Sequence, residues 1–348
     1  MRIFIGAAQS AGNRRERRNS APVTWIRGAV LYPCVGFGSG DGERIMSILL
    51  FHELLPEDHD RLYPYLSAYG DGSCQHSFVS MYALDEKYGD RVCEEDGFLY
   101  TLRSRLCDEA YRVYLAPMGS GDRKQAFRNV LADAHRYGKK AKFHTLTEGC
   151  AAFVQEAFPG VFELREERDL AEYVYRVDRL ASFSGKELKK RRQEVNRFRA
   201  AYGARASVTR MTADDVAAVL EFEQEWVQQN SETHDVSALE REARFGARIL
   251  EHFAAFRIAG VVLRIDGRVR GFSFGTKLND AVFDGLLEKG DREVPHVYKV
   301  LRMELPRQCA DGCIYENIEE DLGIPSLRSM KLQYQPDLLM RKYVVSEK

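Results

Sequence analysis

The sequence predicts an α/β protein of the α+β kind, built from two similar sheets in tandem, each mixed, mostly antiparallel and flanked by helices. Each half of the chain follows the same order of strands, helix, strand, helix and strand. The 348 residues exceed what one ordinary core accommodates, so two domains are the default expectation. The pair Asp266-Gly267 between two apolar runs is a strong short-range signal for a hairpin.

The first domain is expected over residues 46–183. Its clearest helix covers 119–138, where Phe127, Val130 and Ala134 keep a helical spacing and Gly138 suits the position after the last turn. A second helix is expected over 147–158. The expected strands are 97–104, 110–116, 141–146, 161–164 and 172–177.

The second domain is expected over residues 204–348. Helices are predicted over 212–229 and 237–253, and another begins at Pro295, a residue suited to a first helical turn. A short helix is predicted over 325–331. The expected strands are 256–265, 269–277, 281–287, 313–318 and 338–345.

A basic connecting helix is expected over residues 184–203. Ser184 and Glu187 have the spacing of a capping box, and seven basic residues stand against two acidic ones between positions 184 and 199. One interpretation is a face that binds phosphates of a tRNA end, a coenzyme or a lipid headgroup, with Lys189 and Arg192 as ligands. The other is a solvated connector. In this helix a narrow apolar stripe can dock against the protein, formed by Leu188, Val195 and Phe198.

Composition restricts the class of protein. The formal net charge of −1 gives the molecule no overall bias toward nucleic acid, and no DNA partner is expected. Seven scattered cysteines predict neither a disulfide framework nor a metal site. No apolar run approaches the ~18 residues of a membrane span, so a cytoplasmic location is expected. Residues 1–45 are expected to be a disordered tail or the product of a misassigned start, with a basic RNA-binding arm as the alternative.

Two stretches carry a resemblance to a family. YVYRVDRLASFSGKELKKRRQEVNRF (173–198) and ENIEEDLGIPSLRSMKLQYQP (316–336) resemble proteins related to the C-terminal domain of bacterial phosphatidylglycerol lysyltransferases, in particular their stand-alone relatives. The resemblance covers about residues 46–345 and implies two tandem N-acetyltransferase-like (GNAT) folds, similar to Fem-type aminoacyltransferases. It implies transfer of an acyl group, often from aminoacyl-tRNA, to an amine or hydroxyl. The tryptophan that usually follows this proline in the lipid-modifying members is missing, because Asp337-Leu338-Leu339 follows Pro336.

The second stretch supplies a candidate anion site. Pro325 suits a helix start, and Arg328 and Lys331 are three residues apart, so they share a face of that helix. We expect the pair to hold a phosphate or carboxylate of a substrate. The alternative is a set of salt bridges to the acidic residues just upstream, Glu319, Glu320 and Asp321.

Acyl transfer needs a base for the nucleophile and a proton for the leaving group. The candidate catalytic carboxylates lie at strand ends: Glu288, Glu316 and Asp321. Asp284 is a candidate for binding a substrate amino group. Tyr334 is a candidate proton donor, with simple packing as the alternative.

The donor is left open between aminoacyl-tRNA and an acyl-CoA, with no permanently bound cofactor expected. The segment 288–295 has one glycine and three acidic residues where coenzyme A enzymes of the GNAT fold have a glycine-rich pyrophosphate loop. The segment 116–122 is richer in glycine and is either an anion loop or only a loop. Two other functions compete with aminoacyl transfer: acetyl-CoA-dependent N-acetylation, and a non-catalytic binding or regulatory role on the same fold.

Overall fold

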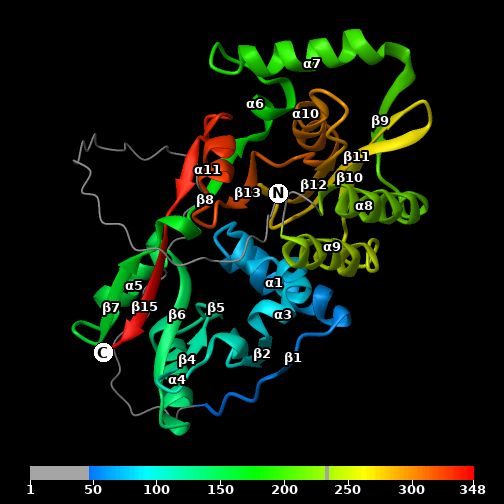
Figure 1. The fold of residues 1–348 in the computed structure, drawn as a ribbon. Coiled ribbons are helices and arrows are strands. Elements are labelled where there is room, and N and C mark those ends of the chain that lie inside the picture. The colour runs from blue at the N-terminus through cyan, green and yellow to red at the C-terminus, as the bar shows by residue number, and fades with distance from the viewer. Residues whose placement is uncertain (1–46, 232–234) are drawn as a thin grey trace.

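The protein is described here by a computed structural model that covers residues 47–231 and 235–348 (Figure 1). The expectation for residues 1–45 lies outside the described residues. Two mixed sheets, each with helices packed against it, make up the molecule. Within the described residues, no helix combines the length and hydropathy needed to cross a membrane.

The first half of the chain supplies most of one sheet. Its strands are β1 (His52–Glu53), β2 (Asp90–Glu95), β3 (Phe98–Arg103), β4 (Tyr111–Tyr114), β5 (Met118–Gly119), β6 (Lys140–Thr147), β7 (Phe162–Glu166) and β8 (Glu172–Arg176). Its helices are α1 (His59–Tyr69), α2 (Phe78–Ala83), α3 (Asp85–Tyr88), α4 (Arg123–Arg136), α5 (Glu148–Ala157) and α6 (Val177–Ser182).

The second half follows after α7 (Lys189–Tyr202). Its strands are β9 (Ala206–Arg210), β10 (Ala259–Ile265), β11 (Arg268–Lys277), β12 (Val282–Gly290), β13 (Tyr315–Glu320), β14 (Leu338–Met340) and β15 (Lys342–Glu347). Its helices are α8 (Val216–Asn230), α9 (Val236–Leu250), α10 (Val297–Cys309) and α11 (Pro325–Leu332).

The two sheets repeat one topology and exchange one strand each. The first sheet has the order β1-β2-β3-β4-β6-β15-β7, and the second has the order β14-β8-β13-β12-β11-β10-β9. In both, a parallel pair (β4 with β6, β12 with β13) is joined through a helix, and the strand beside that pair comes from the other half of the chain. The two similar mixed sheets predicted from the sequence are confirmed.

The expected domain limits divide the chain into two consecutive halves, but each sheet takes a strand from the other half. The strand β8 falls within the expected first domain yet pairs with β13 and β14 of the second sheet. The single strand expected over 338–345 is two strands, because β14 joins the second sheet and β15 returns to the first. Each sheet is therefore complete only when the other half of the chain is folded.

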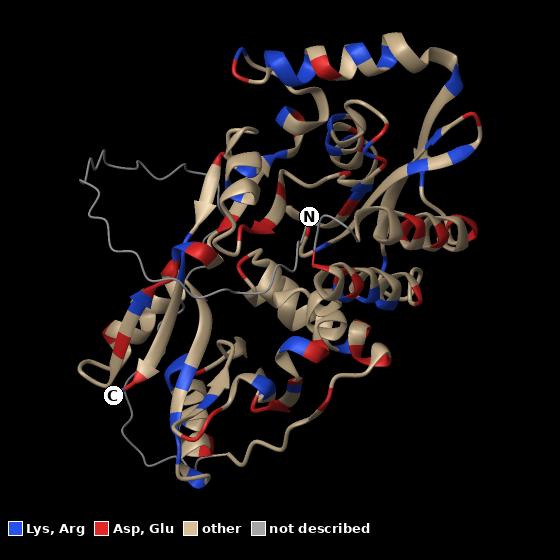
Figure 2. Cartoon of the chain, viewed as in Figure 1, with Lys and Arg blue, Asp and Glu red and all other residues tan. Residues whose placement is uncertain are grey.

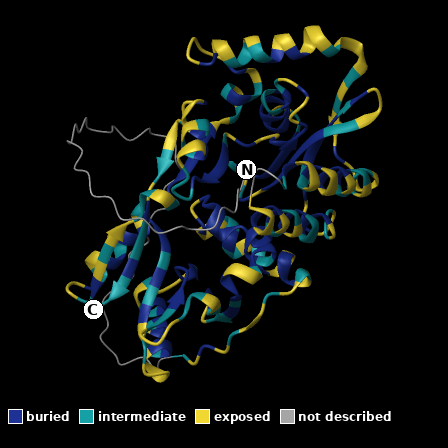
Figure 3. Cartoon of the chain, in the orientation of Figure 1, coloured by how far each residue is buried: buried dark blue, intermediate teal, exposed yellow. Residues whose placement is uncertain are grey.

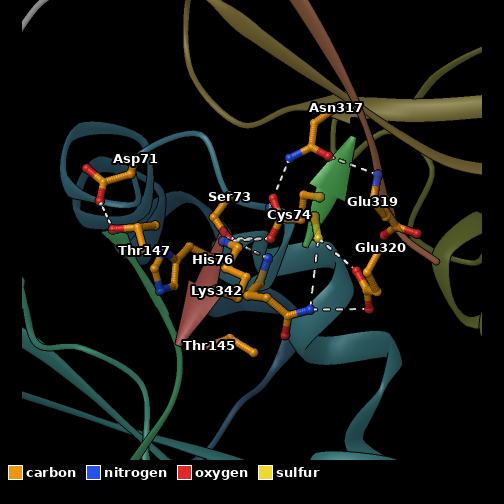
Figure 4. A network of polar contacts seen from close by, with 12 residues as sticks. Asp71, Ser73, Cys74, His76, Thr145, Thr147, Asn317, Glu319, Glu320 and Lys342 are labelled. Atoms are coloured by element: carbon orange, nitrogen blue, oxygen red, sulfur yellow. Dashed lines mark hydrogen bonds and ion pairs between the residues drawn. The ribbon is translucent and has the colours of Figure 1, made fainter. Parts of the chain in front are cut away.

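A buried ion pair marks the point where the exchanged strands pass each other, and Figure 4 labels Lys342 of this pair together with Ser73, Cys74 and Asn317. Glu172 at the start of β8 lies 2.7 Å from the ammonium of Lys342 at the start of β15, and both side chains are fully buried. The carboxylate also accepts hydrogen bonds from Ser73 Oγ at 2.8 Å, the Cys74 N–H at 3.1 Å and Asn317 Nδ2 at 2.6 Å. Charge-assisted hydrogen bonds of this kind join the two sheets.

The basic connecting helix differs from the expectation at its start. The helix α7 begins at Lys189, and no side chain caps it, so the capping box of Ser184 and Glu187 does not form. The reason is that Arg192 turns back and donates to the carbonyls of Phe183 and Gly185, which holds the preceding segment as a loop. The expected apolar stripe of α7 is buried, and the rest of the helix is largely exposed (Figure 3).

Two other local expectations have different outcomes. The Asp266-Gly267 hairpin is confirmed: both residues have positive φ, 52° and 77°, as a type I′ turn requires. The helix expected from Pro295 begins two residues later, at Val297, because His296 takes a left-handed conformation with φ of 67°.

Helices cover both faces of the second sheet. Val262, Phe272 and Leu286 pack in one core cluster with apolar residues of α8 and α9, whereas Val261 and Leu263 face α7 and α10 in another. This alternation along β10 is what a strand buried on both faces requires. It places α8 and α9 on one side of β12 and α10 on the other, around the cavity described next.

Candidate functional site

A cavity of about 230 Å³ lies where β12 and β13 have separated. The parallel pairing of these strands covers only Val282–Asp284 with Tyr315–Asn317, and beyond it β12 continues to Gly290 paired with β11 on its other edge. The walls come from α8, α9, β12, α10 and the α11 segment, through Trp226, Leu239, Glu242, Glu288, Lys289, Arg292, Tyr298, Lys299, Met330 and Tyr334. A largely apolar hollow with a few charged groups is typical of a small-molecule site.

Arg302 of α10 bridges the two separated strands. One guanidinium nitrogen lies 3.1 Å from Glu288 Oε2 on β12, and the other lies 3.0 Å from Glu316 Oε1 on β13. All three side chains are buried. Burial raises the pKa of Glu316 to about 7, although the Arg302 charge opposes that shift. The two predicted catalytic glutamates therefore belong to one buried unit, of which Glu288 faces the cavity.

Tyr334 is the second predicted catalytic residue that lines the cavity. Its hydroxyl oxygen accepts a hydrogen bond from the ammonium of Lys299 at 3.1 Å, and its ring stacks on Phe183 with centroids 5.8 Å apart. The ring is thus packed and the hydroxyl is directed at a cation. The packing alternative describes the ring, and a role of the hydroxyl as proton donor stays a prediction.

The opposite wall holds an ion pair that was not predicted. The ammonium of Lys289 lies 2.8 Å from Glu242 Oε2 and 3.9 Å from the centroid of the Trp226 ring. Glu223 of α8 is buried nearby. A signal did exist in the sequence, because Glu223 and Glu242 stand at apolar-stripe positions of their helices, each three residues before Trp226 or Phe245.

Asp321 and Arg328 lie outside this cavity and bind each other. Arg328 donates to both carboxylate oxygens of Asp321 at 2.8 Å, and Tyr173 and Arg168 donate to the same carboxylate. Burial acts to raise the pKa of Asp321, but the hydrogen bonds, that of Arg328 first, bring it below its usual value. Arg328 also binds Asp169. The salt-bridge alternative thus describes Arg328, and Asp321 holds the fold of this corner.

Lys331 has no donor left for a ligand. Its ammonium is buried and donates to the main-chain carbonyls of Ile318, Glu319 and Glu320 over 2.5 to 3.0 Å. Burial lowers its pKa to about 8. Glu319 has a φ of 64°, so Lys331 stabilises an irregular strand end. Both side chains thus bind groups of the protein itself, and anion binding by Arg328 and Lys331 stays a prediction.

The remaining three predicted residues are also apart from the cavity. Asp284 is fully buried on β12, beside Asn317 in the last parallel pair, and does not line the cavity. Arg192 is used by main-chain carbonyls, as described above. Lys189 is exposed on α7, where blue residues follow the helix in Figure 2.

Comparison with known proteins places these features in a family. Residues 67–346 match the family model described as phosphatidylglycerol lysyltransferase, C-terminal. No curated protein sequence matches significantly. A conserved protein of unknown function from Bacteroides thetaiotaomicron is similar, with 28% identity, a TM-score of 0.80, and coverage of 86% of this chain and 100% of that one.

Two more distant structures share the fold. The L-PGS from Bacillus licheniformis is 14% identical with a TM-score of 0.58, over 85% of this chain and 92% of that one. FemX is 10% identical with a TM-score of 0.54, over 85% and 97%. The expectation of two tandem GNAT-like domains is confirmed.

Proposed function

The chain belongs to the phosphatidylglycerol lysyltransferase C-terminal family, a family of acyltransferases with a GNAT-like fold, and from this premise we propose that it transfers an aminoacyl group to an amine or hydroxyl in the cavity between β12 and α10. The observation that carries the proposal is the position of Glu288. It lies on the cavity wall and is held by Arg302, which also holds Glu316.

The chemistry assigns one proton transfer to each side of the cavity. The acceptor nitrogen or oxygen attacks the acyl carbon of the donor and gives its proton to the Glu288 carboxylate, which releases it to solvent before the next turnover. The ester bond of the donor then breaks, and Tyr334 supplies a proton to the departing oxygen. The hydrogen bond from Lys299 lets Tyr334 regain a proton from the ammonium, which is itself replenished from solvent.

The distribution of charge supports a donor that carries an ammonium group. In and behind the walls, two buried cations, Lys289 and Arg302, accompany four buried glutamates, Glu223, Glu242, Glu288 and Glu316. The other two cations of the lining, Arg292 and Lys299, are exposed or half-buried. An interior with more carboxyl groups than cations, behind a basic rim, suits an aminoacyl group on a phosphate-bearing carrier such as tRNA.

The start of α10 disfavours a coenzyme A thioester as donor. The Val297 and Lys299 N–H groups donate to the carbonyls of Val294 and His296, and Pro295 has no N–H to give. Asp291 adds a carboxylate to the same loop, where it pairs with Arg270. Few amides are left there to bind pyrophosphate.

A donor screen followed by a transfer assay tests the proposal. Thermal unfolding is measured with aminoacyl-tRNAs and with acyl-CoA thioesters, and a donor at one hundred times its Kd stabilises the fold by about 2.7 kcal/mol. The stabilising donor is then used with a labelled acyl group and a panel of amine and hydroxyl acceptors. Glu288→Gln is expected to abolish label transfer while the donor still stabilises the variant.

The exposed neighbour Glu293 offers the matched control. Glu293→Gln is expected to transfer label at the wild-type rate. Stabilisation by acyl-CoA alone would replace the aminoacyl proposal with N-acetylation. If no donor stabilises the protein, or if Glu288→Gln transfers label normally, the catalytic assignment is wrong and a binding role gains support.

A further inference from the structure

Glu223 is a buried carboxyl group that takes no part in the reaction proposed above. It lies on α8 with 1% of its surface exposed, and neither carboxyl oxygen has a hydrogen-bond partner within the described residues. It packs against Gly246 of α9, where an added Cβ would come within 3.0 Å of Glu223 Oε2. Glu242 lies one turn before Gly246 on the same helix face, so the two glutamates are neighbours across the α8–α9 contact.

The cluster contains one more acidic group than basic groups. Lys289 pairs with Glu242 Oε2, whereas Glu242 Oε1 has no hydrogen-bond partner among the residues described. Lys289 and Glu242 both line the cavity, and Glu223 lies behind them. Two buried carboxyl groups beside a single lysine cannot both ionise without leaving an uncompensated charge.

We propose that this cluster of Glu223, Glu242 and Lys289 exchanges a proton for the ammonium group of a substrate. Without ligand, the two glutamates share one proton and the cluster is neutral. When an ammonium group enters the cavity and contacts Glu242, the proton leaves to solvent and the second carboxylate balances the new charge. The inference rests on the proposed aminoacyl transfer and makes Glu223 a positioning residue for substrate charge.

The charged surroundings of Glu223 support its holding that proton. Burial raises its pKa to about 8, the Lys289 charge acts to lower it, and the Glu242 charge acts to raise it. The strand β11, which also packs on α8, places the neutral Phe272 against Phe222. The charged Arg270 of β11 is paired with Asp291.

Three arginines lie on the segments around the cluster: Arg292, Arg302 and Arg244. Arg292 lies 5.7 Å from the centroid of the Trp226 ring, on the exposed side of the cavity. Arg302 is held by Glu288 and Glu316, on the α10 side of β12. Glu86 of α3 pairs with Arg244 of α9 at the surface. The closest positive charge to both glutamates is therefore that of Lys289.

The test measures binding of n-butylammonium, with 1-butanol as its neutral counterpart, to the full chain by ligand-observed NMR and calorimetry. The amine stays charged from pH 6 to 9. Release of one proton per bound amine predicts that its affinity rises about tenfold per pH unit from pH 6 to 8 and then levels off. Calorimetry in buffers of different ionisation enthalpy counts the proton directly. Binding of 1-butanol is expected to stay constant with pH.

Two variants separate the roles within the cluster. Glu223→Gln is expected to bind the amine with no pH dependence and no proton release, at least tenfold more weakly than the wild type at pH 8. Glu242→Gln is expected to lose the preference for the amine over the alcohol. The exposed Glu225 and Glu240, on the same two helices, provide Gln controls that keep the wild-type profile.

The outcomes are decisive in either direction. A flat affinity profile in the wild type overturns the exchange. A profile that persists in Glu223→Gln assigns the proton to another group, with Glu316 the next candidate because its pKa is about 7. Thermal unfolding of each variant checks that the fold is retained. Because binding of butylammonium needs no donor or acceptor, this inference can fail while label transfer succeeds, and the reverse also holds.

Discussion

Removal of the Lys342 ammonium tests whether the strand exchange holds the two sheets together. In Lys342→Met the Glu172 carboxylate would remain fully buried. It would keep the three hydrogen-bond donors from Ser73, Cys74 and Asn317 and lose the Lys342 ammonium. Breaking a buried ion pair by removal of one partner costs about 3–5 kcal/mol. Since the three remaining donors still stabilise the carboxylate, the lower end, about 3 kcal/mol, is expected.

The double variant Glu172→Gln/Lys342→Met isolates the charge effect. The amide oxygen of Gln can still accept from Cys74 and Asn317, and no buried charge is left without its partner. The double variant is therefore expected to be more stable than Lys342→Met alone by about 1–2 kcal/mol, a coupling in the range that double-mutant cycles detect. A surface change such as Lys190→Met should stay within about 0.5 kcal/mol of the wild type.

Urea unfolding followed by fluorescence and circular dichroism provides the measurement. A single transition is expected in the wild type, because each sheet contains a strand from the other half. Two results would contradict this role of the pair: a cost of less than about 1 kcal/mol for Lys342→Met, or unfolding of the wild type in two separate steps. Either result would mean that the sheets do not depend on the buried pair.

Three further predictions concern single residues. Lys331→Met should destabilise the fold by roughly 3 kcal/mol or more, since three buried carbonyls lose their donor; urea unfolding measures this, and a neutral result would reopen a ligand-binding role. Gly246→Ala should cost about 1–3 kcal/mol because its Cβ would meet Leu287 at 2.8 Å, and its thermal unfolding should be compared with that of Gly149→Ala, where the Cβ meets nothing within 4 Å. The pKa of Glu223 is raised to about 8, so the folded chain keeps a proton that the unfolded chain releases above pH 4.5. The free energy of unfolding therefore falls as the pH rises from about 5 to 8, by up to ~1.4 kcal/mol per pH unit. Glu223→Gln should remove that component of the slope, and equal slopes in the two proteins would contradict the assignment.

Much of the local structure follows from the sequence because its signals are short-range. The helical spacing around Phe127 and the Asp266-Gly267 turn depend on residues within one or two turns of each other. The same holds for α11, which begins at Pro325 as predicted. The repeated order of elements in the two halves also predicted a pair of similar sheets. Of the expected catalytic residues, Glu288 and Tyr334 do line one cavity.

Tertiary structure decided which groups the charged side chains contact. Arg328 and Lys331 share a helix face, as their spacing predicts, but one meets Asp321 and the other three carbonyls of β13. Glu223 and Glu242 come from different helices, and only the packing of α8 on α9 brings them beside Lys289. Such meetings depend on angles and separations between elements that no local pattern contains.

The exchange of β8 and β15 is the clearest case of a feature beyond local sequence. Sequence alone determined that strands exist near 172–177 and 338–345, because apolar periodicity fixes the element. Which sheet each strand enters was decided by pairing between residues far apart in the chain, such as Glu172 with Lys342. Periodicity along a strand shows which faces are buried, but the partner at its edge is selected by the whole core.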